Sequence, residues 1–147
     1  MGLSGTYVHQ LDGKNRIRIP KRLRAKLPEN EAIYFVKYEG GCVAVFTESV
    51  LDQRIEAFGP IRSNQPELLR QKRALMRAIV EVEEDDQHRT LFPAALREYA
   101  GIKKDVVSVG MGDYIEIWAA ERFAEQPDDP MQYPEAPIED ALHNLAF

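Results

Sequence analysis

The chain has 147 residues, of which 44% are hydrophobic and 29% charged, so it suits one compact soluble domain whose halves would each be marginal alone. Its formal net charge of -5 argues against a surface that coats nucleic acid in general. No stretch reaches the roughly 20 apolar residues that a bilayer span requires, and no basic N-terminal segment precedes a long apolar run, so we expect a cytosolic protein without a membrane partner.

The first predicted elements form a strand-loop-strand-helix unit. Residues 7–11 and 16–19 alternate between apolar and polar side chains, which predicts two short strands. The Asp-Gly-Lys-Asn sequence at residues 12–15 tolerates positive φ and predicts a hairpin loop between them. Pro20 then opens a short helix, because its missing N–H would be unpaired at the first helical position, and Pro28 ends it.

Two more strands and two helices follow. Residues 33–37 and 43–46 predict strands, and Cys42 lies just before the second of them. A single cysteine excludes an internal disulfide and a cysteine zinc site, so we expect it to pack as a small hydrophobe. Apolar stripes predict one helix capped by Thr47 and another after Pro66. We expect both stripes to face the core rather than to form a binding groove, and the sequence leaves those around Ile55 and Leu75 open as contacts between subunits.

The first unit then returns. Residues 12–24, DGKNRIRIPKRLR, recur as residues 85–97, DDQHRTLFPAALR, with Asp, two Arg, Pro and Leu repeated at the same spacing. The second copy predicts strands at 80–83, 90–92, 106–109 and 115–118, and a helix that starts at Pro93 with Gly101 as its C-terminal cap. Two copies of this length suggest a pseudo-symmetric pair with one shared core.

We therefore predict a mainly β fold with short helices, of the α+β class. The expected organisation is a first repeat over residues 1–58, a connecting helix over 59–79, a second repeat over 80–124 and an acidic, proline-containing tail over 125–147. Prolines in the tail disfavour regular structure until a short helix through Ile138, Leu142 and Leu145, which would either dock on a neighbouring subunit or fray.

Charge is distributed unevenly along the chain. Seven basic residues and no acidic residue lie between Lys14 and Lys26, and a second basic run extends from Arg62 to Arg77. Five acidic residues lie within residues 81–86, a run more typical of a solvated face than of a metal or catalytic site. The positive segments could steer a polyanion toward one face despite the negative total.

The doubled Asp-x-x-x-Arg pattern, each followed by an apolar strand and a proline-led Leu-Arg helix, resembles the MraZ family of bacterial transcriptional regulators. The segments LREYAGI at 96–102 and IEIW at 115–118 are also similar, and the resemblance covers roughly residues 4–124. It implies an AbrB-like fold in which the two repeats form one swapped-hairpin β-barrel. It also implies a nucleoid-associated, ring-shaped homo-oligomer that binds double-stranded DNA at repeated boxes upstream of the division and cell-wall gene cluster.

The first loop carries side chains that could read DNA. In a major groove, Arg16 can bond guanine and Asn15 can bond adenine, each in a bidentate way. The other candidate contacts, which suit a loop tip and phosphates, are Lys14, Arg18, Lys21 and Arg22. Arg16 could alternatively form a structural ion pair with Asp12, and the two roles are compatible.

The family motif implies that Arg16 and Arg89 contact DNA, while Asp12 and Asp85 shape the two loops through hydrogen bonds to loop amides or to the arginines. The family has glycine before each arginine, where this chain has Asn15 and His88. Both residue types are enriched at positive φ, so the turn can persist.

The second copy lacks several basic side chains of the first. Gln87 replaces a lysine, and Ala94 and Ala95 replace Lys21 and Arg22. We therefore expect the first copy to supply most of the phosphate affinity, while the second mainly completes the barrel.

Enzymatic chemistry is not indicated. The three histidines share no metal-ligand spacing and the chain has no phosphate-binding loop motif, so we expect no catalytic residues, no metal, no cofactor and no small-molecule substrate. The rival interpretation is an antitoxin-like protein-binding module of the same fold class, whose basic loop would grip an acidic partner.

Overall fold

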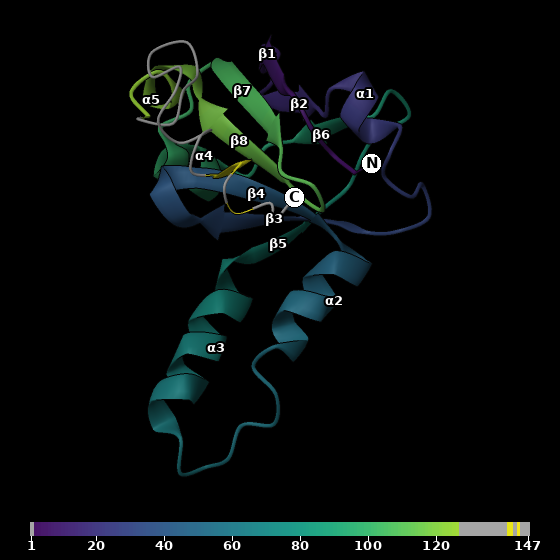
Figure 1. Cartoon of the computed structure of the whole chain (residues 1–147). Helices are drawn as coiled ribbons and strands as arrows, with labels where there is room; N and C mark the ends of the chain where they lie inside the picture. The colour runs from purple at the N-terminus through teal and green to yellow at the C-terminus, as the bar shows by residue number, and fades with distance from the viewer. Residues whose placement is uncertain (1, 127–140, 143, 145–147) are drawn as a thin grey trace.

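A computed structural model describes residues 2–126, 141, 142 and 144 (Figure 1). Six antiparallel strands form a sheet in the order β1-β7-β8-β4-β3-β5, and β2 and β6 form a separate two-stranded ribbon. The strands are β1 (Thr6–Gln10), β2 (Arg16–Arg18), β3 (Ile33–Tyr38), β4 (Cys42–Thr47), β5 (Ile79–Val82), β6 (Arg89–Leu91), β7 (Asp105–Gly110) and β8 (Ile115–Ala119). The helices are α1 (Lys21–Arg24), the 3₁₀ turn η1 (Glu39–Gly41), α2 (Glu48–Glu56), α3 (Pro66–Ala78), α4 (Ala94–Ala100) and α5 (Ala120–Phe123).

The predicted hairpin between the first two strands is wrong. β1 pairs with β7, and β2 pairs with β6, so each strand that borders the first loop pairs with a strand of the second repeat. β2 is too short to form a stable hairpin alone, whereas pairing with β6 places its central Ile17 opposite Thr90. Both central side chains are thereby buried, at 1% and 3% exposure.

The two repeats share one hydrophobic core, as predicted. Its largest cluster combines Leu23 and Phe35 of the first repeat with Phe92 and Leu96 of the second. The rings of Phe35 and Phe92 pack edge to face with centroids 5.3 Å apart, a favoured aromatic geometry. Neither repeat can bury these side chains without the other.

The α+β class is confirmed, but a closed barrel is not found. Within the described residues the six-stranded sheet ends at β1 and β5, and these two edge strands do not pair with each other. The extended strand β5 begins at Ile79, directly after α3 ends at Ala78. The predicted C-terminal helix falls largely outside the described residues.

Helices α2 and α3 extend away from the sheet as a pair (Figure 1). Their apolar residues Leu51, Ile55 and Leu75 pack with Val36 and Phe46 of the sheet, which confirms the core-facing stripes for the halves of the two helices nearest the sheet. The side chain of Thr47 makes no capping hydrogen bond, although the residue occupies the N-cap position of α2. None of the helices in the described part of the chain is long and apolar enough to cross a bilayer.

Cys42 is fully buried beside Val107 and Trp118. Burial raises the pKa of its thiol to about 12, so the reactive thiolate is not populated at neutral pH. The predicted packing role of this cysteine is confirmed.

Candidate nucleic-acid interface

The first loop is closed by one carboxylate. Asp12 Oδ1 accepts hydrogen bonds from the backbone N–H groups of Lys14 and Arg16, each at 2.9 Å, and Asp12 Oδ2 accepts a 2.7 Å bond from Arg16 Nε. These bonds, above all the one from the Arg16 backbone, lower the pKa of Asp12 to about 2. The carboxylate thus stays ionised and holds both the loop and the arginine.

The second loop repeats this geometry. Asp85 Oδ1 accepts from the backbone N–H groups of Gln87 and Arg89 at 2.9 Å, and Asp85 Oδ2 accepts from Arg89 Nε at 2.8 Å. The bond from the Arg89 backbone is the main cause that lowers the pKa of Asp85. Asn15 and His88 both have φ of 59°, which confirms that these residues take the left-handed conformation expected at the position of the family's glycine.

The ribbon of β2 and β6 brings the two loops together. Arg18 lies directly opposite Arg89, and Arg16 lies opposite Leu91. Because strand side chains alternate, these four residues share the outer face while Ile17 and its partner point inward. Arg16 Nη1 also approaches Asp85 Oδ2 at 4.0 Å, so the first-repeat arginine contacts the second-repeat loop.

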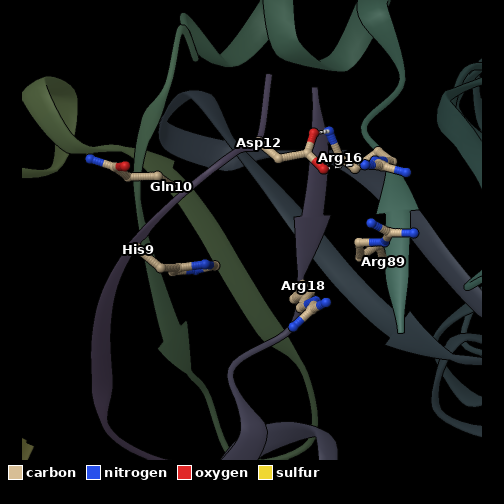
Figure 2. Close-up of a pocket in the computed structure, with 6 residues that line it drawn as sticks. All are labelled: His9, Gln10, Asp12, Arg16, Arg18 and Arg89. Carbon is tan, nitrogen blue, oxygen red and sulfur yellow. Dashed lines mark hydrogen bonds and ion pairs between the residues drawn. The ribbon is translucent and has the colours of Figure 1, made fainter. Parts of the chain in front are cut away.

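A cleft of about 510 Å³ opens between this ribbon and β1. Figure 2 shows Arg16, Arg18 and Arg89 on its ribbon side, with His9 across from them on β1. Three guanidinium groups converge here, and like charges directly opposite on a strand pair are unfavourable. Loop carboxylates already pair with two of these groups, Arg16 with Asp12 and Arg89 with Asp85. Arg18 bonds the neutral amide of Gln87, so the cleft keeps a positive charge that suits a phosphate or the acceptor edge of a base.

The other predicted basic residues are placed differently. Lys14 is exposed at the tip of the first loop. Lys21 lines a neighbouring cleft with Arg18 and the second-loop residue Gln87. Arg22 lines a third cleft with Tyr7, so the structure does not bring it to the arginine cleft.

Two side chains on β1 that the sequence did not indicate also line the arginine cleft. His9 is hydrogen-bonded through Nε2 to Ser108 Oγ at 2.7 Å, and burial lowers the pKa of its imidazole. Gln10 donates to Asp105 Oδ1 at 2.7 Å. The available signal was proximity in sequence, because β1 leads directly into the first loop and Gln10 lies two residues before Asp12.

Polar interactions between the repeats were likewise not predicted. Glu84 accepts three hydrogen bonds of 2.8 to 3.1 Å from Arg24, and the two side chains are only 14% and 12% exposed. Glu84 is therefore not part of a solvated face, and Arg24 is engaged inside the molecule. In addition, Arg18 Nη2 donates to Gln87 Oε1 at 3.0 Å. The sequence signal for the pair of Arg24 and Glu84 was the opposite charge of the acidic run at residues 81–86 and the basic segment from Lys14 to Lys26.

Metal ligation finds no support in the described residues, which contain no group of three or more His, Cys, Asp or Glu side chains arranged to hold an ion.

Comparison with known proteins identifies one family. A family model described as "MraZ protein, putative antitoxin-like" matches residues 3–49 and 75–140. A transcriptional regulator MraZ of Clostridium botulinum (strain Alaska E43 / Type E3) is 35% identical over 136 residues, which are 88% of this chain and 89% of the relative. The same-named protein of Symbiobacterium thermophilum is 38% identical over 130 residues, covering 85% and 89%. That of Heliobacterium modesticaldum is 36% identical over 124 residues, covering 82% and 83%.

The fold and the site thus define a class of protein in which two loop-bearing repeats interlock and each contributes an arginine to one cleft. The chain belongs to the MraZ family.

Proposed function

We propose that this protein is a transcriptional regulator that binds double-stranded DNA through the arginine cleft. The observation that carries the proposal is the convergence of Arg16, Arg18 and Arg89 on one outer face, two of them held by loop carboxylates. The matched relatives bear the name transcriptional regulator, which agrees with it. The target is proposed to be the repeated boxes upstream of the division and cell-wall gene cluster, and the protein acts in the cytoplasm at the nucleoid.

Each arginine of the loops keeps donors for a base. Arg16 and Arg89 each bond their loop aspartate through Nε rather than through a terminal nitrogen, although Arg16 Nη1 also lies 4.0 Å from Asp85 Oδ2. A guanidinium fixed through Nε is pre-organised, so less side-chain freedom is lost when it bonds guanine. We assign Arg16 and Asn15 to base contacts, with Arg89 reaching DNA from the second repeat.

Phosphate contacts fall to the basic side chains that flank the first loop. Lys14 and Lys21 are exposed near it, and Arg22 extends the positive surface along α1. Asp12 and Asp85 serve as positioning residues, since their bonds order the loops that carry the arginines. Phosphate contacts of this kind orient a protein on the duplex without reading its sequence.

Assembly completes the proposal. A single cleft with few contacts binds DNA weakly, since non-specific dissociation constants are typically about 10⁻⁴ to 10⁻⁶ M. A ring-shaped homo-oligomer presents several clefts to evenly spaced boxes and raises avidity by roughly 10² to 10⁴. The pairing of strands between repeats supports the AbrB-like swapped-hairpin class for each subunit.

The proposal is tested by fluorescence anisotropy with the DNA upstream of the protein's own gene and a scrambled duplex, across a salt series. The expected result is tighter binding to the native duplex, a steep fall of affinity with salt, and loss of the preference in Arg16→Ala. Arg70→Ala is the matched control, because Arg70 is an exposed arginine on α3 that pairs with Glu67. Equal and weak binding to both duplexes would reject sequence reading by the cleft and leave the antitoxin-like alternative, which requires that an acidic protein partner copurify with this chain.

A further inference from the structure

One large apolar side chain lies on the outer face of the arginine ribbon. Leu91 is 65% exposed, whereas its neighbour Thr90 is buried. Leu91 lies directly opposite Arg16, at the other end of the ribbon from the pair of Arg18 and Arg89. A lone exposed leucine is ordinary on a protein surface, so its exposure decides nothing. Its position on the same face as three arginines is what indicates a role in binding.

Leu91 also lies beside the tip of the first loop. The backbone N–H of Phe92, the next residue, donates a 2.9 Å hydrogen bond to the carbonyl oxygen of Asn15. In the repeat alignment Leu91 occupies the position that Arg18 holds in the first copy. The duplicated ribbon thus presents a cation at this position in one repeat and an aliphatic group in the other.

The major groove contains one apolar group that matches such a side chain, the C5 methyl of thymine. Residues opposite each other in an antiparallel pair have Cα atoms about 4.5 to 5.5 Å apart. Successive bases of one strand rise by about 3.4 Å. A side chain opposite Arg16 therefore reaches the base that Arg16 bonds or the one beside it.

We infer that Leu91 is a specificity-determining residue that packs against a thymine methyl next to the base read by Arg16. The inference rests on the proposed function, because it requires the ribbon face to enter the major groove. Removal of a buried methyl from such an interface weakens binding about fourfold. Leucine offers no hydrogen-bond donor, so it selects thymine over cytosine through this methyl alone.

The test uses the upstream DNA of the protein's own gene in two forms, one normal and one with every thymine replaced by deoxyuridine. This replacement removes the C5 methyl groups and leaves each Watson–Crick pair in place. Affinities are measured for the wild-type protein, for Leu91→Ala, and for Met76→Ala as a matched control on α3, where Met76 is 48% exposed. We expect the wild-type protein and Met76→Ala to bind the deoxyuridine duplex about fourfold more weakly for each methyl group that the protein contacts. For Leu91→Ala, the ratio of the affinities for the two duplexes should be about fourfold smaller than the wild-type ratio, because this variant contacts one methyl group fewer.

Four results would overturn the inference. If Leu91→Ala keeps the full wild-type loss on deoxyuridine DNA, another residue reads the methyl groups. If the wild-type protein prefers its own duplex over a scrambled one but ignores the replacement, the proposed function stands and the role of Leu91 is wrong. If Leu91→Ala instead changes the subunit number in analytical ultracentrifugation, Leu91 is a contact between copies. Equal wild-type binding to native and scrambled DNA would reject the proposed function itself, and the inference with it.

Discussion

The two loops have the same backbone and different side chains. Each is closed by an aspartate that accepts two backbone bonds and one arginine Nε bond, and each has a residue at φ of 59° before the arginine. Yet residues 12–24 carry six Lys or Arg against one Asp, whereas residues 85–97 carry two Arg against two Asp. Duplication has kept the turn and not the charge.

The difference separates two tasks that a repeat can perform. The first copy presents exposed basic side chains around its loop, and the second copy supplies groups that hold the first. Glu84 binds Arg24, and Gln87 accepts a bond from Arg18. We interpret the first loop as the main DNA reader and the second as its support, with Arg89 as the part of the second loop that still faces the cleft.

The largest expected effect comes from the ion pair that joins the copies. Arg24→Ala leaves Glu84 largely buried without its partner, which should lower the free energy of unfolding by about 3 kcal/mol. The equivalent Arg97 donates a 3.4 Å bond to the Phe92 carbonyl, so Arg97→Ala should cost about 1 kcal/mol. Urea unfolding measures both losses of unfolding free energy. Equal losses would contradict the interpretation that Glu84 of the second copy specifically holds Arg24 of the first.

The next effect distinguishes the two arginines at the cleft. Arg16→Ala should weaken binding to the native duplex about tenfold or more and remove its preference over scrambled DNA, because alanine cannot make the bidentate bond to a base. Arg89→Ala should weaken binding less, since its own loop and helix carry fewer basic side chains than those of the first copy. Anisotropy titrations of the two variants at one salt concentration measure this order. Intact affinity in Arg16→Ala with abolished affinity in Arg89→Ala would reverse the assignment of the reader.

The sequence was sufficient for features that depend on local chemistry. The two repeats, the positive φ of Asn15 and His88, the Gly101 cap and the burial of Cys42 follow from residue type and spacing. Strand pairing did not follow, because residues 7–11 and 16–19 look the same whether they pair with each other or with the second repeat. The choice depends on burying Ile17 in a core to which both repeats contribute, and that core has no local signal.

The candidate site divides in the same way. The loop residues and their arginines could be named from the repeated motif, and the sequence predicted the bond that Arg16 donates to Asp12 as one of two alternatives for Arg16. His9 and the pair of Arg24 with Glu84 could not be named, because their positions depend on contacts between distant segments. Arg24 shows the limit plainly, since it belongs to the basic segment but is engaged inside the molecule.

A smaller effect follows from the charges around the two short helices. Lys21→Ala with Arg22→Ala makes α1 resemble α4, and removing each phosphate contact should reduce the slope of log affinity against log salt by about 0.9. The reciprocal change, Ala94→Lys with Ala95→Arg, should raise the slope because both alanines are exposed. Titrations at several salt concentrations give the slopes. An unchanged slope in the first variant would show that α1 does not face phosphate.

The smallest effect concerns the aspartate carboxylate that closes each of the two loops. The folded protein lowers the pKa of Asp12 to about 2, below the value of about 3.9 for an unfolded chain. The unfolded state therefore binds more protons between these values, and the stability from ionised Asp12 is complete above about pH 4 and lost as the pH falls toward about 2. Asp12→Asn, which keeps the accepting oxygen but not the charge, should thus be less stable than the wild-type protein near neutral pH, and the difference should shrink as the pH falls toward the folded pKa. Asp85→Asn should behave in the same direction, because the pKa of Asp85 is lowered by the same bonds. Thermal unfolding of both variants across this acidic range measures the difference, and one that grows as the pH falls would show that the loops are not held by their carboxylates.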